Sequence, residues 1–348
     1  MAGVLAVLSA DVVEVLEHAE RANTARAIAA RMARRIIGPL NPRFEVTQAD
    51  CAGPGKGGST LGGAAWRGTA KHLTLCAMRY FKMNGCGNDF VIIDARSRGS
   101  LPLSMAQAKA IADREAGLGC DQVIALERSM RGDAYMRIWN ANGGEVEACG
   151  NATRCVAWLL MEEGGAASRR IETPAGILYA ERRGEKLITV DMGSPLLRWE
   201  EIPIARAMDT AQLDFEAGGL TGPGAANMGN PHVIFFVNDV RATPVEMLGA
   251  KVELDPLFPQ KVNVGFAEVR SPEQIRLRTW ERGVGITKAC GTGACAAVVA
   301  AHRQGRTGRK VEVLADGGSL EIEWRAGDDR VLMTGPIELE ATGELPAA

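Results

Sequence analysis

The segment "RIWNANGGEVEACG" at residues 137–150 recurs without a gap as "RTWERGVGITKACG" at residues 278–291. The two copies lie 141 residues apart, so that a tryptophan, a glycine and a terminal Ala-Cys-Gly coincide. Upstream, "GNDFVI" from Gly87 recurs as "GNPHVI" from Gly229 at an offset of 142 residues. Two motifs repeated in the same order at nearly the same separation predict a duplicated domain.

Each copy of the repeat predicts the same local structure. From Met78 onward, short β-branched runs alternate with turns rich in Gly, Asn and Asp, which is typical of strands. The helices expected after the two Ala-Cys-Gly motifs, "GNATRCVAWLLMEEG" and "GTGACAAVVAAHRQG", are apolar on nearly every side, as buried helices are. We therefore expect an α+β fold of two pseudo-symmetric domains, each a curved, mostly antiparallel β-sheet or barrel around a central buried helix.

A chain of 348 residues is long enough for two domains. We expect an N-terminal domain at residues 78–197 and a C-terminal domain at residues 198–335, with a strand from about residue 336 to 348 returning to the first domain. Residues 1–77 differ in composition, and we interpret them as a flexible N-terminal extension or the product of a misplaced start site. Their passage "GPGKGGST" is not a phosphate-binding loop, because glycine follows its lysine where Ser or Thr is required.

Charge and cysteine usage exclude several classes of protein. The net charge is -2 and no long run of one sign occurs, which argues against nucleic-acid and membrane-surface partners. No apolar stretch reaches the roughly 18 residues of a membrane span. The eight cysteines are irregularly spaced and include no Cys-x-x-Cys pair, so they predict free thiols and not disulfides or metal ligands. We expect a cytoplasmic protein with a small-molecule partner and no metal.

Cys149 and Cys290 occupy equivalent positions at the expected starts of the two buried helices. At a helix N-terminus, unpaired N–H groups and the helix dipole favour negative charge and can lower a thiol pKa from about 8.5 to roughly 3.5–7.5. The same donors form a site for a carboxylate. They are the backbone N–H groups of Gly150, Asn151, Gly291 and Thr292.

The paired cysteines suggest a chemical reaction. Inversion of a carbon stereocentre by proton transfer needs a base on one face and an acid on the other. Two thiols suit this task because thiol and thiolate are close in energy near neutral pH. A single cysteine at a helix start is more often a small buried residue, as we assume for Cys155 and Cys295 inside the helices, but a matched pair favours catalysis. The sequence therefore predicts an amino-acid epimerase that needs no cofactor and uses Cys149 and Cys290 as acid and base.

Six motifs in order give the chain a family resemblance. From about Met78 nearly to the C-terminus, it resembles diaminopimelate epimerase, whereas residues 1–77 are not covered. The motifs are "KMNGCGNDFVIID", "GLGCDQ", "WNANGGEVEACGNATRC", "MGNPH", "NVGF" and "WERGVGITKACGTGACA". The resemblance implies epimerisation of LL-2,6-diaminopimelate to meso-2,6-diaminopimelate without pyridoxal phosphate, in lysine and peptidoglycan precursor biosynthesis. It also implies a homodimer.

The resemblance assigns roles to individual residues. It implies that Cys149 and Cys290 are catalytic and that His232 and Glu281 tune the thiols. The implied substrate-binding residues are Asn88, Gln122, Asn140, Gly150, Asn151, Asn230, Asn263, Glu281, Arg282, Gly291 and Thr292. A guanidinium such as that of Arg282 suits bidentate binding of a distal carboxylate. Without the resemblance, the asparagines beside Gly, Ala or Pro are turn residues by default.

Some positions depart from the family pattern, and some alternatives stay open. Asn142-Gly143-Gly144 stands where Asp-Gly-Ser is common, and the other departures are Ala152, Cys86 and Cys120. A proline-racemase-like enzyme is an alternative, although a His is expected there in place of Asn151. A redox-switched thiol protein, with a disulfide between the paired cysteines, and a binding module for a dicarboxylic amino acid are the others.

Overall fold

A computed structural model describes residues 78–147 and 149–345. Within them, residues 79–343 form one unit, which contains every element discussed below apart from Met78, Glu344 and Leu345 at the ends of two strands. The extension expected at residues 1–77 lies outside the described residues. No helix in the described part of the chain is long and apolar enough to cross a membrane.

The strands and helices fall into two sets, which we call the N-lobe (β1 to β8) and the C-lobe (β11 to β18). The N-lobe contains β1 (Met78–Gly85), β2 (Asn88–Asp94), α2 (Met105–Ala112), β3 (Gln122–Glu127), β4 (Ala134–Asn140), β5 (Glu145–Val146), α3 (Gly150–Gly164), β6 (Ser168–Thr173), β7 (Gly176–Gly184) and β8 (Leu187–Asp191). The C-lobe contains β11 (Gly224–Asn227), β12 (Pro231–Phe236), α4 (Val245–Glu253), β13 (Asn263–Ser271), β14 (Gln274–Glu281), β15 (Gly285–Thr287), α5 (Gly291–Arg303), β16 (Lys310–Ala315), β17 (Gly318–Trp324) and β18 (Val331–Pro336). Outside these sets lie β9 (Glu216–Ala217), β10 (Leu220–Thr221) and β19 (Glu338–Leu345).

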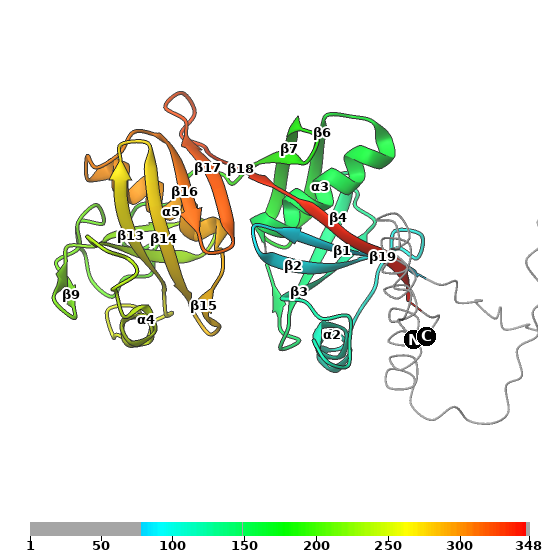
Figure 1. Cartoon of the computed structure of the whole chain (residues 1–348), viewed down its shortest axis with the longest axis horizontal. Helices are drawn as coiled ribbons and strands as arrows, with labels where there is room; N and C mark the ends of the chain where they lie inside the picture. Colours follow the sequence, from blue (N-terminus) through cyan, green and yellow to red (C-terminus); the bar gives the residue numbers. More distant parts are fainter. Residues whose placement is uncertain (1–77, 148, 346–348) are drawn as a thin grey trace, which may run out of the picture. The chain divides into compact units, whose positions relative to one another are not determined.

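The two lobes repeat one strand-pairing scheme. In the N-lobe, β2 pairs with β3 in parallel, β3 with β4 antiparallel, and β4 with β6 in parallel. In the C-lobe, β12, β13, β14 and β16 pair with the same directions in the same order. Figure 1 shows a sheet wrapped around a helix in each lobe, α3 in one and α5 in the other. The predicted fold class, with its duplication and its central helices, is confirmed.

The central helices owe their burial to small and apolar side chains. In α5, every residue from Ala294 to Ala301 is buried, and the helix packs against seven C-lobe strands. Burial of a valine such as Val298 stabilises the fold by roughly 1.5–3 kcal/mol. Arg303 in the last turn complements the negative end of the helix dipole. Helix α3 is followed by the C-cap Gly165, whose φ of 66° is the left-handed conformation that glycine adopts without a steric cost.

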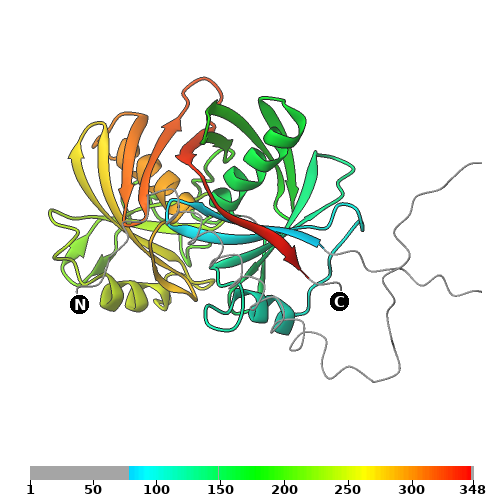
Figure 2. The same cartoon turned by 45° about the vertical axis from the view of Figure 1, so that its right-hand side comes forward.

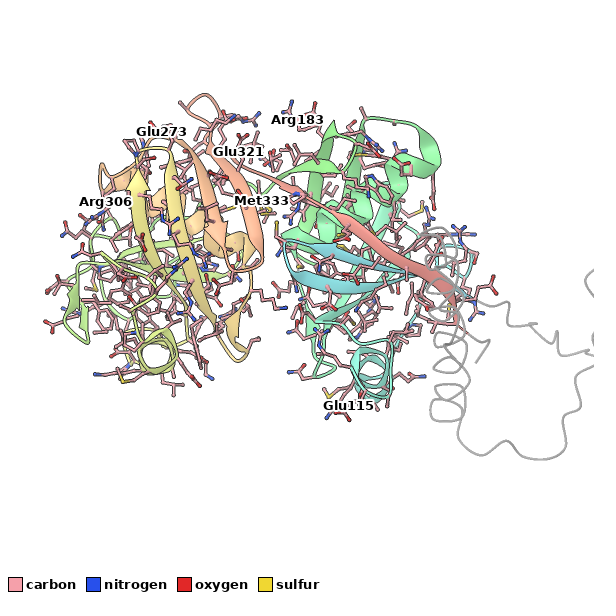
Figure 3. The ribbon with its side chains drawn as sticks, viewed as in Figure 1. Glu115, Arg183, Glu273, Arg306, Glu321 and Met333 are labelled. Carbon is pink, nitrogen blue, oxygen red and sulfur yellow. The ribbon has the colours of Figure 1, made fainter. Side chains whose placement is uncertain are left out.

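The lobes are joined along equivalent strands. Strand β18 of the C-lobe pairs antiparallel with β8 of the N-lobe, so that Met333 lies opposite Val190. Figure 3 shows Met333 between the lobes. Strand β19 then pairs with β1 along the N-lobe, as Figures 1 and 2 show. The domain boundaries expected from the sequence stay a prediction.

Candidate active site

A cavity of about 890 Å³ has walls from both lobes. The N-lobe contributes residues from the ends of β1 to β4 and from the start of α3, and the C-lobe contributes residues of β14, β15 and α5. Cys149 and Cys290 both line it, together with the first two residues of each helix that they precede. The paired thiols and the helix-start donors therefore face one cavity.

Cys149 is the N-cap of α3 and has an extended backbone. Its Sγ lies 4.0 Å from Oδ1 of Asn88. Burial raises the pKa of Cys149 to about 11, and the negative charge of Glu281 acts in the same direction, whereas backbone N–H groups of Ala152 and Asn151 and the charge of Arg154 lower it. The helix start thus favours the thiolate as the sequence predicts, but desolvation outweighs it.

Cys290 is the N-cap of α5 and is 7% exposed. Its Sγ accepts a hydrogen bond of 3.4 Å from the Gly293 N–H and lies 3.5 Å from Oγ1 of Thr292. Burial, followed by the charge of Glu281, raises the pKa of Cys290 well above its usual value. Both cysteines are therefore thiols at neutral pH when the cavity is empty.

His232 lies behind the cavity wall and is fully buried. Its Nε2 is 2.9 Å from Oδ1 of Asn230 and 3.0 Å from Oγ1 of Thr292. Burial, followed by the positive charge of Arg282, lowers the pKa of His232 to about 3, so the imidazole is neutral. Through Thr292, His232 is connected to Cys290.

Glu281, at the end of β14, lines the cavity beside Cys290. Its Oε1 accepts a hydrogen bond of 2.5 Å from Oγ1 of Thr287. Burial raises the pKa of Glu281, which the hydrogen bonds from Thr287 and Cys290 partly offset. The negative charge of Glu281 adds to the effect of burial, which is the larger cause, in raising the pKa of both thiols.

Neutral amides line the N-lobe side of the cavity. Nε2 of Gln122 donates to Oδ1 of Asn140 at 2.9 Å. Nδ2 of Asn88 donates to Oδ2 of Asp121 at 2.8 Å, and Asp121 is paired with Arg114. Asn88 and Asn140 stand at strand ends, where asparagine is common because of its turn propensity. Both of them also line the cavity.

Two predicted substrate-binding residues do not line the cavity. The amide of Asn263 is engaged with backbone, since Nδ2 donates to the Pro231 carbonyl and Oδ1 accepts from the Arg282 N–H. Nη1 of Arg282 donates to the carbonyl of Gln260 at 3.0 Å. The cations that line the cavity are Arg114 and Lys288, neither of which belongs to the residues predicted from the sequence.

The sequence gives little basis for predicting these two cations. Arg114 stands in an ordinary polar segment after a helix, and in the structure it lines the cavity while paired with Asp89 and Asp121. Lys288 lies two residues before Cys290, and this proximity in sequence is the one feature that could have indicated its place at the cavity. Within residues 78–147 and 149–345, no group of three or more His, Cys, Asp or Glu side chains is arranged to hold a metal ion.

Comparison with protein families identifies two matched segments in this chain. The family model described as diaminopimelate epimerase matches residues 80–197 and 224–340. A curated diaminopimelate epimerase of Phenylobacterium zucineum is 54% identical over 271 residues, which cover 77% of this chain and 97% of the relative. That of Acidiphilium cryptum is 52% identical over 272 residues, with 78% and 98% covered.

Solved structures with the same fold are more distant in sequence. A predicted epimerase from Pseudomonas aeruginosa matches with a TM-score of 0.58 and 17% identity, covering 78% of this chain and all of that one (100%). A hydroxyproline epimerase from Agrobacterium vitis with bound trans-4-hydroxy-L-proline matches with a TM-score of 0.56 and 18% identity, covering 77% and 90%. At such identities the likeness concerns the fold alone.

Proposed function

The chain belongs to the diaminopimelate epimerase family, and on that premise we propose that Cys149 and Cys290 are the acid and the base that invert one α-carbon of diaminopimelate. The activity is that of an isomerase in lysine biosynthesis. The observation that carries the two-thiol assignment is that both cysteines cap equivalent helices and line one cavity.

In the proposed reaction, one cysteine is a thiolate and takes the α-proton from one face of the carbon. The opposing thiol gives its proton to the other face, so one thiolate and one thiol are present before and after the reaction. The roles exchange with the direction of reaction. Because burial raises the pKa of both thiols, the positive α-ammonium group of the substrate is needed to stabilise the thiolate.

The helix starts provide the site for the reacting carboxylate. The N–H groups at the first turns of α3 and α5 both point toward the cavity end of their helices, where a negative charge is stabilised. A Cβ built on Gly291 would lie 3.1 Å from Oδ1 of Asn151, so the two helix starts are close together. As negative charge develops on the carboxylate during proton abstraction, these fixed donors stabilise it more strongly than in the ground state.

The other end of diaminopimelate carries a second ammonium and a second carboxylate. Glu281 is suited to accept hydrogen bonds from that ammonium, because it is a carboxylate on the cavity wall. Nη1 of Arg282 donates to the Gln260 carbonyl, and the other donors of this guanidinium are the ones left to bind the distal carboxylate. The cations on the cavity wall itself are Lys288 and Arg114, of which Arg114 is already paired with Asp89 and Asp121.

We extend the proposal to the surroundings of the enzyme. The family resemblance supports a cytoplasmic location, a homodimer and a reaction without a cofactor. Light scattering on purified protein at micromolar concentration is expected to give twice the mass of the chain, and a monomer mass would contradict the homodimer.

Deuterium incorporation tests the proposed chemistry directly. Reduced protein is incubated with LL-diaminopimelate in deuterated water, and the product is analysed by mass spectrometry and NMR. We expect meso-diaminopimelate with deuterium at the inverted α-carbon, since the proton that arrives comes from a thiol that has exchanged with solvent. Product without deuterium would exclude proton transfer from solvent-exchanged thiols, and absence of product would contradict the epimerase activity.

A further inference from the structure

Arg154 is a buried cation in α3 whose charge is not neutralised by a carboxylate of the described residues. Its side chain is 0% exposed. Nη1 donates to Oδ1 of Asn151 at 2.9 Å and lies 3.5 Å from Sδ of Met333. Nε and Nη2 have no hydrogen-bond partner among the described residues. Because burial of an unpaired charge destabilises a fold by several kcal/mol, a purely structural role would be better served by an apolar side chain.

The repeat provides a natural control for this position. The residue of α5 that corresponds to Arg154, 141 positions later, is Cys295, which is also fully buried. The same place in the same kind of helix is therefore filled by a small uncharged side chain in the C-lobe. The guanidinium is not a requirement of the repeated fold, and it distinguishes the environment of Cys149 from that of Cys290.

Arg154 begins a hydrogen-bonded chain that ends beside Cys149. Nη1 of Arg154 donates to Oδ1 of Asn151, and Nδ2 of Asn151 donates to Oδ1 of Asn88 at 3.4 Å. Nδ2 of Asn88 then donates to Oδ2 of Asp121 at 2.8 Å. A guanidinium can only donate and a carboxylate can only accept, so the two ends fix the direction of both amides. Oδ1 of Asn88 is thereby turned toward Sγ of Cys149, 4.0 Å away, where it accepts from the thiol S–H, so any preference for the thiolate comes from the charge of Arg154 and not from this amide.

The charges around the two thiols also differ. Cys149 is influenced by the positive charge of Arg154, which favours its thiolate, and by the negative charge of Glu281, which opposes it. The main charge acting on Cys290 is that of Glu281. The charge of Arg154 also acts on three further thiols, and burial raises the pKa of each; they are Cys86, Cys155 and Cys295.

We propose that Arg154 is a positioning residue whose buried guanidinium favours the thiolate of Cys149 over that of Cys290 and locks the Asn151 and Asn88 amides beside it. This inference rests on the proposed role of Cys149. Its consequence is that the two cysteines, although equivalent in the repeat, take up the role of base at different pH.

The test follows alkylation of each cysteine as a function of pH. Reduced protein is treated with iodoacetamide, and the peptides of Cys149 and Cys290 are quantified separately by mass spectrometry. The midpoint pH of each rate profile gives the pKa of that thiol. It does not depend on how accessible the thiol is to the reagent. We expect Arg154→Met to raise the Cys149 midpoint by about one pH unit, which is tenfold less thiolate, and to leave that of Cys290 unchanged. Arg154→Lys, which keeps the charge, is expected to recover most of the shift.

Three results would overturn the proposal: no shift in Arg154→Met, equal shifts of both thiols, or a Lys variant that behaves like the Met variant. Arg169→Met is a matched control, because that guanidinium binds the Leu160 carbonyl of the same helix away from the cavity. If Arg154→Met does not fold, Arg154→Gln, which removes the charge and keeps a hydrogen-bond donor, takes its place with the same expected shift of Cys149 alone.

Turnover gives a second readout that loosened packing would not mimic. In Arg154→Met, the acid limb of the kcat/KM profile is expected to move up in pH in the direction of reaction that uses Cys149 as base, and not in the other. A shift of equal size in both directions would overturn the proposal. Alkylation needs no turnover, so failure of the Arg154 proposal and failure of the epimerase proposal are distinguishable.

Discussion

The Nε2 atom of His232 lies 3.0 Å from Oγ1 of Thr292, so a buried imidazole is in contact with a hydroxyl of the cavity wall. That hydroxyl lies 3.5 Å from Sγ of Cys290. Nε2 also lies 2.9 Å from Oδ1 of Asn230, an oxygen that only accepts, so the neutral imidazole carries its hydrogen on Nε2. Such a nitrogen cannot accept from the Thr292 hydroxyl, which is left to donate to the Cys290 thiolate. The imidazole thus acts on the thiol through the hydroxyl and not as a general base.

Removal of the hydroxyl is expected to affect Cys290 selectively. Thr292→Val keeps the backbone N–H and the size of the side chain but cannot donate to the thiolate. A hydrogen bond to a charged group is worth about 1.5–3 kcal/mol, so we expect at least a tenfold loss of kcat. Alkylation profiles should show a higher midpoint for Cys290 and an unchanged midpoint for Cys149. Thr292→Ser, which retains the hydroxyl, should lose much less, and equal losses in the two variants would contradict the role of the hydroxyl.

The neutral state of His232 predicts how stability depends on pH. Its pKa is about 3 in the folded protein and about 6.5 in the unfolded chain, so between these values the unfolded chain binds the extra proton. The free energy of unfolding therefore falls as pH decreases through this window, by about 1.4 kcal/mol per unit for this group. Above pH 6.5, His232 is neutral in both the folded and the unfolded state, so its titration no longer changes the free energy of unfolding.

Urea unfolding at pH 7, 6 and 5 measures this contribution. In His232→Gln the group is removed, so the stability difference from the unmodified protein is expected to shrink as pH falls. His302→Gln changes another C-lobe histidine, which contacts the Thr307 carbonyl, and serves as the control. A stability difference that stays constant from pH 7 to pH 5 would show that His232 is not held neutral.

The repeat made the main features of the fold and site predictable from sequence. The shared motif alone relates Cys149 to Cys290, and the motif that carries each cysteine ends in a helix start in both lobes. The position of a residue in the sequence did not indicate where its side chain points. Arg282 was expected at the cavity, but its guanidinium meets the Gln260 carbonyl in this structure. Such an orientation depends on a neighbour 22 residues away, which no local pattern reports.

Desolvation was the other quantity that the sequence did not provide. The helix starts of α3 and α5 favour a thiolate, as expected, yet burial raises the pKa of both cysteines. The depth of burial results from packing between the lobes, where Met333 covers both helix starts. Arg154 was missed for the same reason, because an arginine inside a helix is by default solvated.

Glu281 is expected to control both the thiols and the substrate. Glu281→Gln removes the negative charge that disfavours a neighbouring thiolate, so the pKa of Cys290 should fall, and its alkylation midpoint should drop by about one pH unit. The same change weakens binding of the distal ammonium, and we expect KM for diaminopimelate to rise at least about tenfold. Glu321→Gln, an exposed carboxylate labelled in Figure 3, is the control. An unchanged or higher midpoint for Cys290 in Glu281→Gln would contradict the charge argument.

Substitution of each cysteine separates the two half-reactions. Cys149→Ala and Cys290→Ala each remove one partner of the proton transfer, and since acid or base catalysis contributes about 10²–10⁴-fold, epimerisation should fall by roughly that factor or more. The remaining thiolate can still remove and return a proton on its own face. We therefore expect α-hydrogen exchange in deuterated water without inversion, with the LL isomer in one variant and with the inverted centre in the other. Cys295→Ala, a buried thiol of α5 outside the cavity, should retain epimerisation. Exchange of the same isomer in both variants would show that the two thiols do not act on opposite faces of one carbon.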